Sequence, residues 1–233
     1  MQFFLVKDLT AGVEKAKEAL TKELDSKTIF FLSGGSTPKS LYEVLAKEQV
    51  IHPAGVGLID ERYGEPMHAN SNELMIKGTG LLDYFEKKHI PFYSMLQKSM
   101  DREQSARYYD QKSRDLFFHF PKSVAILGIG KDGHTAGIAP NRSHFTNPLF
   151  EKEREHLYVS EFDDPTGPFG QRITMTFTGL SLIDKIIVFV FGEDKQEALK
   201  TAFTPGYLKD CPARFFQQPD IAQKTLFITD QKL

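Results

Sequence analysis

Short apolar runs alternate with amphipathic segments along most of the chain. The runs are rich in Val, Ile and Phe, which suits strands that are buried on both faces. They cover residues 28–32, 56–59, 124–127, 186–191 and 226–229. Between them, apolar residues recur at helical spacing, as at Leu41, Val44 and Leu45. This alternation is typical of βαβ units, so the pattern predicts an α/β fold built on a mostly parallel sheet.

The pattern is least regular between residues 141 and 171. Pro148, Pro165 and Pro168 interrupt this stretch, so we expect loops over one edge of the sheet. The chain has no internal repeat, no low-complexity tract and no stretch that marks an interdomain linker. We therefore expect residues 1–233 to form a single domain.

Composition and charge argue against several kinds of binding partner and structural feature. The formal net charge is −2, which argues against a nucleic-acid binder. The apolar run at the N-terminus is too short for a signal peptide or a membrane span. Cys211 is the only cysteine, so an internal disulfide is impossible, and no zinc-type Cys/His spacing exists. We expect a cytoplasmic monomer or small homo-oligomer that binds neither nucleic acid nor membrane.

The run at 28–32 leads into a loop of glycines and hydroxyls, SGGST at 33–37, and then into Pro38. We expect Thr37 to cap a helix whose first residue is Pro38. The loop would lie at the carboxyl end of a parallel strand, where α/β folds bind ligands. Its glycines would let backbone N–H groups approach an anion such as phosphate. A tight, well-capped turn without a ligand fits the same residues, and this stretch alone does not separate the two interpretations.

The run at 56–59 ends in three consecutive charged residues, and the candidates among them are Asp60 and Arg62. They would stand at the same edge of the sheet as the loop at 33–37. Taken alone, the pair is explained more simply as a solvated strand end with a local ion pair. No metal site follows from it, because no further ligand occurs at a diagnostic spacing.

The run at 124–127 leads into a glycine-rich turn, GIGKDGH at 128–134. The turn matches the G-x-G-x-x-G dinucleotide pattern, but the helix and the strand with an acidic end that should follow are missing. His134 lies in this turn, at the predicted carboxyl end of a strand, and is a candidate general base. Asp132 is close enough in sequence to orient the His134 ring or to bind substrate.

Three cationic residues nearer the C-terminus are candidate ligands for an anion. Lys195 falls in the first turn of a predicted helix, where its charge is unfavourable unless it reaches an anion. Arg172 begins a short β-like run. Arg214 follows Pro212, and a rigid turn there would aim its side chain inward. Each of the three also fits an ordinary surface position.

Six short blocks together resemble the 6-phosphogluconolactonase family, whose superfamily also includes the glucosamine-6-phosphate deaminases. The blocks are SGGSTP, DER, LGIGKDGHTA, RITMT, GEDK and PAR, in the order and approximate spacing of that family along nearly the whole chain. The resemblance implies a Rossmann-like α/β fold with helices on both faces of the sheet. It also implies a sugar-phosphate substrate and a hydrolase of the pentose phosphate pathway. The chain departs from the family pattern at 63–66, at Lys131 and in GIAPN at 137–141. These differences concern the details of substrate recognition more than the fold.

The resemblance further implies roles for individual residues. Those expected to bind the phosphate are Gly34, Gly35, Ser36, Thr37, Arg172, Lys195 and Arg214. In catalysis, His134 is expected to be the base, and Asp132 and Asp60 are expected to position the substrate or the His134 ring. Arg62, or alternatively nearby backbone N–H groups, is expected to stabilise the oxyanion.

Within the superfamily, the blocks fit a lactonase, a deaminase or a non-catalytic sugar-phosphate-binding domain. The deaminases have a glutamate five residues after the histidine, where this chain has Ala139. Lactone hydrolysis needs less acid–base chemistry, namely one base for one water and donors for the oxyanion. We therefore expect hydrolysis of 6-phospho-D-glucono-1,5-lactone, without metal or organic cofactor, and keep the deaminase as the alternative. A binding domain would keep the phosphate loop and dispense with the base, whereas the DGH motif is intact here.

Overall fold

The main feature of the computed structural model is a six-stranded parallel sheet. The structure describes residues 1–140, 157–164 and 169–232. In sheet order, the strands are β1 (Gln2–Leu5), β9 (Thr225–Thr229), β8 (Lys185–Val190), β5 (Lys122–Leu127), β2 (Thr28–Leu32) and β3 (Gly55–Leu58). Each neighbouring pair is parallel. The predicted parallel α/β sheet is confirmed, and each of the five apolar runs overlaps one strand.

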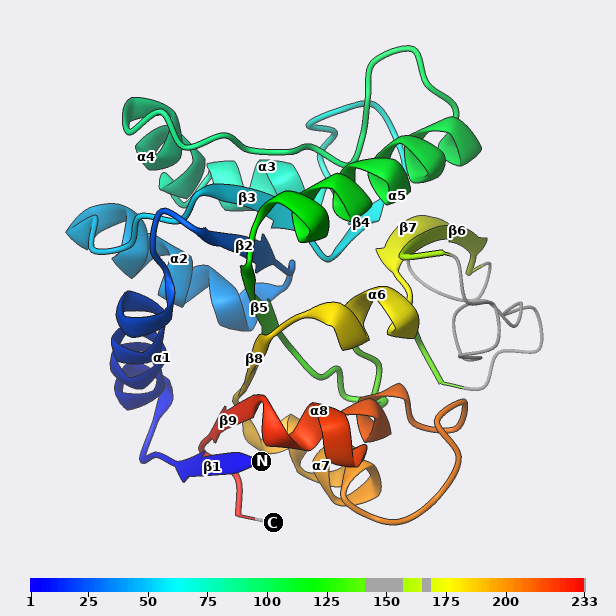
Figure 1. Ribbon diagram of the computed structural model, residues 1–233. Coiled ribbons are helices and arrows are strands. Elements are labelled where there is room, and N and C mark those ends of the chain that lie inside the picture. Colours follow the sequence, from blue (N-terminus) through cyan, green and yellow to red (C-terminus); the bar gives the residue numbers. More distant parts are fainter. Residues whose placement is uncertain (141–156, 165–168, 233) are drawn as a thin grey trace.

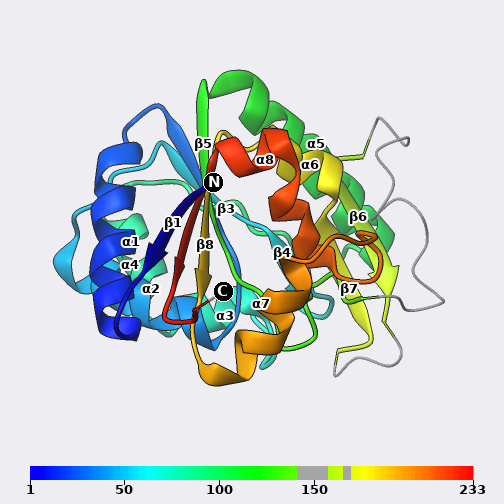
Figure 2. The same cartoon turned by 90° about the horizontal axis from the view of Figure 1, so that it is seen from below.

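Helices cover both faces of this sheet. They are α1 (Leu9–Glu23), α2 (Ser36–Glu48), α3 (Asn72–Lys77), α4 (Leu81–Lys87), α5 (Arg102–His119), α6 (Phe177–Leu182), α7 (Gln196–Ala202) and α8 (Pro219–Gln223), with the short 3-10 helices η2 (Glu193–Lys195) and η3 (Pro212–Gln217). Figure 2 shows α1, α2 and α4 on one side of the sheet and α5, α6, α7 and α8 on the other. In the part of the chain that the structure describes, no helix combines the length and apolar character needed to cross a membrane.

A second, antiparallel sheet has the order β4 (Asp60–Arg62), β7 (Gln171–Met175), β6 (Val159–Asp163). In Figure 1, β6 and β7 lie beside α5 and α6. The run at 56–59 continues into this sheet, because the Ile59 N–H donates to Leu32 O of the large sheet and the Ile59 C=O accepts from Met175 N of the small one. The chain therefore crosses from one sheet to the other just before Asp60.

The expectation of loops between 141 and 171 is wrong in one respect, because β6 lies within that stretch. Only two of its five residues, Val159 and Phe162, are buried, so it gives only a weak apolar signal in the sequence. Residues 141–156 and 165–168 of the stretch lie outside the described residues.

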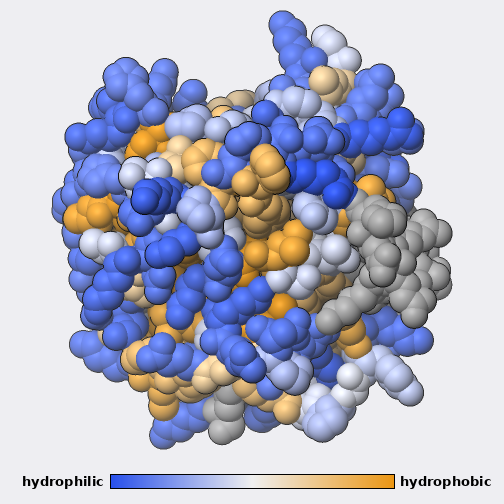
Figure 3. All heavy atoms as spheres, in the orientation of Figure 1, coloured by the Kyte–Doolittle hydropathy of each residue, from blue (hydrophilic) through white to orange (hydrophobic). Residues whose placement is uncertain are grey.

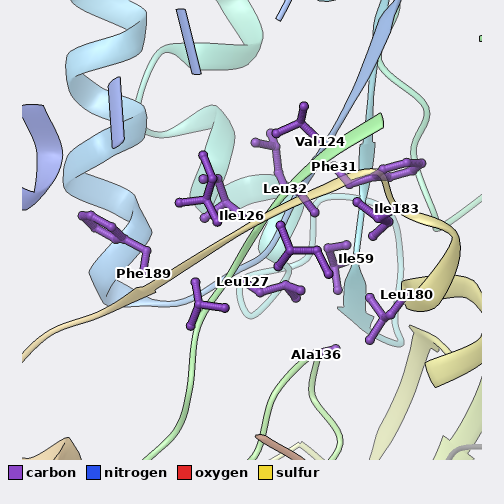
Figure 4. Packing of buried hydrophobic residues seen from close by; sticks show 14 of the residues in the cluster. Phe31, Leu32, Ile59, Val124, Ile126, Leu127, Ala136, Leu180, Ile183 and Phe189 are labelled. Atoms are coloured by element: carbon purple, nitrogen blue, oxygen red, sulfur yellow. The ribbon is translucent and has the colours of Figure 1, made fainter. Parts of the chain in front are cut away.

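The core fills the space between the sheet and its helices. Figure 4 shows Leu32, Ile126 and Leu127 from two adjacent strands packed together with Phe189 from the next. Ala136, from the turn after β5, lies at the border of this cluster. The turn that carries His134 is thus anchored on the core.

Most of the face in Figure 3 is hydrophilic, with apolar side chains gathered near its centre, over α5 and α6. Among the side chains of α5 and α6, Phe118 is 86% exposed and Leu182 is 40% exposed, and both line one surface hollow. This patch lies at the amino-terminal end of β5, away from the strand ends that the next subsection describes.

The sheet order reverses between β2 and β5. From β2 the chain continues to β3 on one side, and from β5 it continues, through the small sheet, to β8 on the other. Open α/β sheets bind ligands outside the carboxyl ends of the strands at such a reversal. The loops at 33–37 and 128–137 leave the sheet at this point.

Candidate active site

A cavity lies at the reversal point, and most of the predicted site residues line it. Its described lining is Ser33, Gly34, Gly35, Ser36, Thr37, Pro38, Asp60, Arg62, Asn72, Gly128, Ile129, Gly130, His134, Ala136, Gly137, Arg172, Phe189 and Lys195. The structure therefore brings together residues that lie far apart in the sequence. Of the predicted site residues, only Asp132 and Arg214 are absent from this lining.

The loop after β2 presents the start of α2 to the cavity. The helix begins at Ser36, earlier than predicted, and Gly35 rather than Thr37 occupies the N-cap position. Gly35 has φ +111°, a conformation that side chains rarely adopt, and no side chain caps the helix. The hydroxyl of Tyr42, a buried residue of α2, donates to Ser33 O (2.9 Å) and thereby holds the loop against the helix. Uncapped N–H groups at a helix start favour an anion, so the geometry suits a phosphate.

The turn after β5 holds His134 against Asp132. Gly130 N donates to His134 O (2.8 Å), and Gly133 takes φ +82° to close the turn. His134 Nδ1 lies 2.6 Å from Asp132 Oδ1, and both side chains are close to half exposed. No helix follows His134 directly; the described residues 135–140 form turns and an isolated bridge.

The protonation state of Asp132 determines which ring nitrogen of His134 carries the proton and which one can accept a proton. Burial acts to raise the pKa of Asp132, but its hydrogen bonds with His134 and the charge of that ring outweigh burial and lower the pKa to about 2. An ionised carboxylate can only accept hydrogen bonds, so Nδ1 of His134 must be the donor. In the neutral ring Nε2 is then the unprotonated nitrogen, which is the atom a general base needs.

A buried ion pair joins β4 and β7 of the small sheet at the cavity wall. Arg172 Nη2 donates to Asp60 Oδ2 (2.9 Å), with 8% and 5% of the two residues exposed. Gly137, at φ +69°, packs directly on this pair, because an added Cβ would lie 2.6 Å from Arg172 Nη2 and 2.9 Å from Asp60 Oδ2. The turn and the ion pair therefore depend on a glycine at 137.

Arg62 pairs with Arg172 in the β4–β7 register. Arg62 lines the cavity, and its guanidinium is held by contacts with residues that do not line it. Its Nη1 donates to Asn70 O (2.9 Å), and its guanidinium stacks over the Phe169 ring, 4.5 Å from the ring centre. Burial lowers the pKa of Arg62 from its ordinary value, and the neighbouring charge of Asp60 acts in the opposite direction. The Nε atom is buried without a hydrogen-bond partner. These contacts fix the guanidinium in place.

Lys195 reaches the cavity from η2, at the end of the loop after β8. The neighbouring Asp194 pairs with Lys131 of the His134 turn (3.0 Å), which links the two loops. Together with Arg62 and Arg172, Lys195 gives the described lining three cationic side chains against one carboxylate, Asp60. The cavity is therefore suited to an anionic ligand.

Arg214 does not line the cavity, contrary to the expectation from the turn at Pro212. Its Nε and Nη1 atoms donate to Thr204 O and Tyr207 O, both at 2.9 Å. Its side chain also packs on Gly206 and lines a different hollow. The turn at Pro212 thus directs Arg214 toward the loop after α7 rather than toward the cavity.

Asn72 was missed as a candidate site residue. It is fully buried, lines the cavity and begins α3. Its residue type alone does not reveal this role, because α3 reaches the cavity through contacts with β4 that depend on the fold. The described residues contain no group of three His, Cys, Asp or Glu side chains that could hold a metal ion.

Comparison with known proteins gives consistent matches over almost the full chain. The family described as "Glucosamine-6-phosphate isomerases/6-phosphogluconolactonase" matches residues 5–227. A 6-phosphogluconolactonase of Nostoc is 31% identical over 227 residues, covering 90% of this chain and 88% of the relative. One of Synechocystis is 33% identical over 196 residues, covering 80% and 76%. The crystal structure of the Thermotoga maritima 6-phosphogluconolactonase superposes with a TM-score of 0.71 at 28% identity, covering 98% of each chain.

Proposed function

The chain belongs to the family of glucosamine-6-phosphate isomerases and 6-phosphogluconolactonases, and we propose from this membership that it hydrolyses 6-phospho-D-glucono-1,5-lactone to 6-phospho-D-gluconate. The activity is that of a carboxylic-ester hydrolase in carbohydrate metabolism, in the pentose phosphate pathway. We further propose that the whole chain acts as one cytoplasmic domain.

One observation carries the proposal: an uncapped helix start and an oriented histidine line the same cationic cavity. The start of α2 offers backbone N–H groups and the hydroxyls of Ser36 and Thr37 to the phosphate. Lys195 and Arg172 add positive charge to that end of the substrate. With the phosphate docked there, the lactone ring is directed toward His134.

The proposed reaction needs one base and one oxyanion site. Nε2 of His134 takes a proton from water, and the water oxygen bonds to the lactone carbonyl carbon. The guanidinium of Arg62 stabilises the negative charge that develops on the carbonyl oxygen. The bond between the carbonyl carbon and the ring oxygen then breaks, and His134 returns its proton to that ring oxygen. Asp132 holds the His134 ring in the required tautomer throughout.

The carboxylates of the site favour the lactonase over the deaminase. Of the described residues that line the cavity, only Asp60 carries a carboxylate, and Arg172 is paired with it. Position 139, where the resemblance places the glutamate of the deaminases, is a buried alanine. Amine release and ring opening need additional proton transfers, for which this lining offers no further carboxylate.

The experiment compares the two substrates directly. Purified protein is added to freshly made 6-phosphogluconolactone, and lactone loss is followed against the spontaneous rate. Ammonia release from glucosamine 6-phosphate is measured in parallel. The proposal predicts accelerated lactone loss without ammonia release; ammonia release with lactone loss at the spontaneous rate would overturn it in favour of the deaminase.

A further inference from the structure

The middle residue of β4, Glu61, is not part of the cavity but holds the start of α3. Its Oε1 accepts from the N–H groups of Arg62 and Asn72, both at 2.7 Å, and its Oε2 accepts from Glu73 N at 2.9 Å. The side chain is fully buried. Because side chains alternate along a strand, Asp60 and Arg62 face the cavity while Glu61 faces α3. The carboxylate thereby fixes Asn72 against the strand that carries both of those residues.

The amide of Asn72 fills the space between this strand and the phosphate loop. Its Nδ2 donates to Asp60 O at 2.8 Å. Its Oδ1 is buried without a hydrogen-bond partner and faces Gly34. A Cβ added at Gly34 would lie 1.8 Å from Oδ1 and 2.7 Å from Nδ2. The two sides of the cavity are therefore in contact through this one side chain.

We infer that Asn72 is a positioning residue that sets the separation between the phosphate loop at Gly34 and the strand at Asp60, and that Glu61 holds Asn72 in place. The inference rests on the proposed function, since it assigns the loop to a phosphate. It also explains why position 34 is a glycine. Gly35 needs its unusual φ, whereas Gly34 has an ordinary φ and lacks only the room for a side chain.

A double-mutant cycle between positions 34 and 72 tests this inference. Gly34→Ala alone must displace the loop, because its methyl group overlaps the Asn72 amide. In an Asn72→Ala background the overlap is removed, so the same change at 34 has little further effect. Asn72→Ala alone should raise KM for the lactone about 3- to 10-fold, with a smaller change in kcat, as expected for loss of a bracing hydrogen bond. Asn72→Ser is the second variant, should Asn72→Ala not fold.

Gly35→Ala is the matched control, because its backbone strain does not involve Asn72. Its effect on KM should be the same with and without Asn72. Calorimetric binding of 6-phosphogluconate provides a readout that does not depend on turnover, and it should follow KM. A merely structural role would lower thermal stability and leave KM and this affinity unchanged.

The outcomes separate the two claims. If the unsubstituted protein neither hydrolyses the lactone nor binds 6-phosphogluconate, the proposed function fails. If it does both, and Gly34→Ala has the same effect whether Asn72 is present or absent, the positioning role of Asn72 is overturned.

Discussion

Nδ1 of His134 lies 2.6 Å from Oδ1 of Asp132, within one turn that follows the central strand β5. The same carboxylate oxygen also accepts from the His134 backbone N–H, at 3.1 Å. One short side chain thus fixes both the ring and the backbone of the proposed base. The pairing also leaves Nε2 as the nitrogen that can accept a proton from water.

Asp132→Asn should lower kcat about 10- to 100-fold, the worth of a charge-assisted hydrogen bond. The amide can still contact the ring, but it no longer imposes the tautomer with Nδ1 protonated. KM should change little, because the phosphate contacts are untouched. Steady-state kinetics on the lactone checks this. Equal kcat for the variant and the unsubstituted protein would mean that Asp132 does not orient the ring.

The low pKa of Asp132 also sets a pH expectation. Its carboxyl titrates near 2 rather than near 3.8, so it stays ionised across the range in which the enzyme can be assayed. Its stabilising contact with His134 is present above about pH 4 and is lost only as the pH falls toward 2. The Asp132 carboxyl should therefore add no acid limb of its own to the pH–rate profile above about pH 4.

Gly137→Ala should impair the site through backbone strain and by displacing the Asp60–Arg172 pair. Both effects follow from its φ of +69° and from the 2.6 Å that would separate its Cβ from Arg172 Nη2. We expect kcat/KM to fall at least about 10-fold, since breaking a buried charge pair costs several kcal/mol. Gly170→Ala is the control, because a Cβ there would meet nothing within 4 Å. Comparable losses in both variants would contradict this explanation.

Lys195→Ala should mainly raise KM, by about 10- to 100-fold, because a charge-assisted contact to phosphate contributes binding energy in the ground state and the transition state alike. Lys200→Ala, an exposed lysine on α7 that pairs with Glu197, provides the control. Kinetics on the lactone separates KM from kcat. An unchanged KM in Lys195→Ala would remove Lys195 from the phosphate site.

Glu61 should make stability fall as the pH rises. Burial raises the pKa of Glu61 from 4.5 to about 7, although three backbone N–H groups act in the opposite direction. Between these values the folded protein keeps a proton that the unfolded chain has released, so the contribution is full below about pH 4.5 and lost as the pH approaches 7. The change amounts to something on the order of 3 kcal/mol.

Urea unfolding between about pH 5 and about pH 8 measures this contribution as the free energy of unfolding. Glu61→Gln should lose the slope, because the amide does not titrate, and should be less stable throughout, because an amide nitrogen cannot accept from Glu73 N. Glu43→Gln, at an exposed position on α2, should keep the slope. A parallel pH dependence in all three proteins would contradict the raised pKa.

The large sheet could be predicted because buried parallel strands are continuous apolar runs, and the run at 28–32 coincides with β2 residue for residue. The small sheet could not, since β6 is only partly buried and β4 pairs with β7, which is distant from it in the sequence. The start of α2 was misplaced because Thr37 and Pro38 form a good capping pair, whereas Gly35 takes the cap position through its positive φ.

The site residues likewise fall into those that the sequence signals locally and those that only the fold brings to the cavity. His134 and the loop at 33–37 carry local signals, namely glycines and the ends of apolar runs. Asn72 reaches the cavity through hydrogen bonds with Glu61 and Asp60 that form only in the folded chain. Arg214 was predicted from a turn whose direction the sequence does not encode, and its guanidinium binds the carbonyls of Thr204 and Tyr207 instead.

The role of His134 as the base is tested by the kcat of His134→Ala on 6-phosphogluconolactone, corrected for spontaneous hydrolysis. His119→Ala, an exposed histidine at the end of α5, is the control, and 6-phosphogluconate binding shows that the site is still formed. We expect kcat to fall about 10²- to 10⁴-fold in His134→Ala, the usual contribution of a general base, while 6-phosphogluconate binding and the kcat of His119→Ala are preserved. A folded His134→Ala protein with near-normal kcat would show that His134 is not the base.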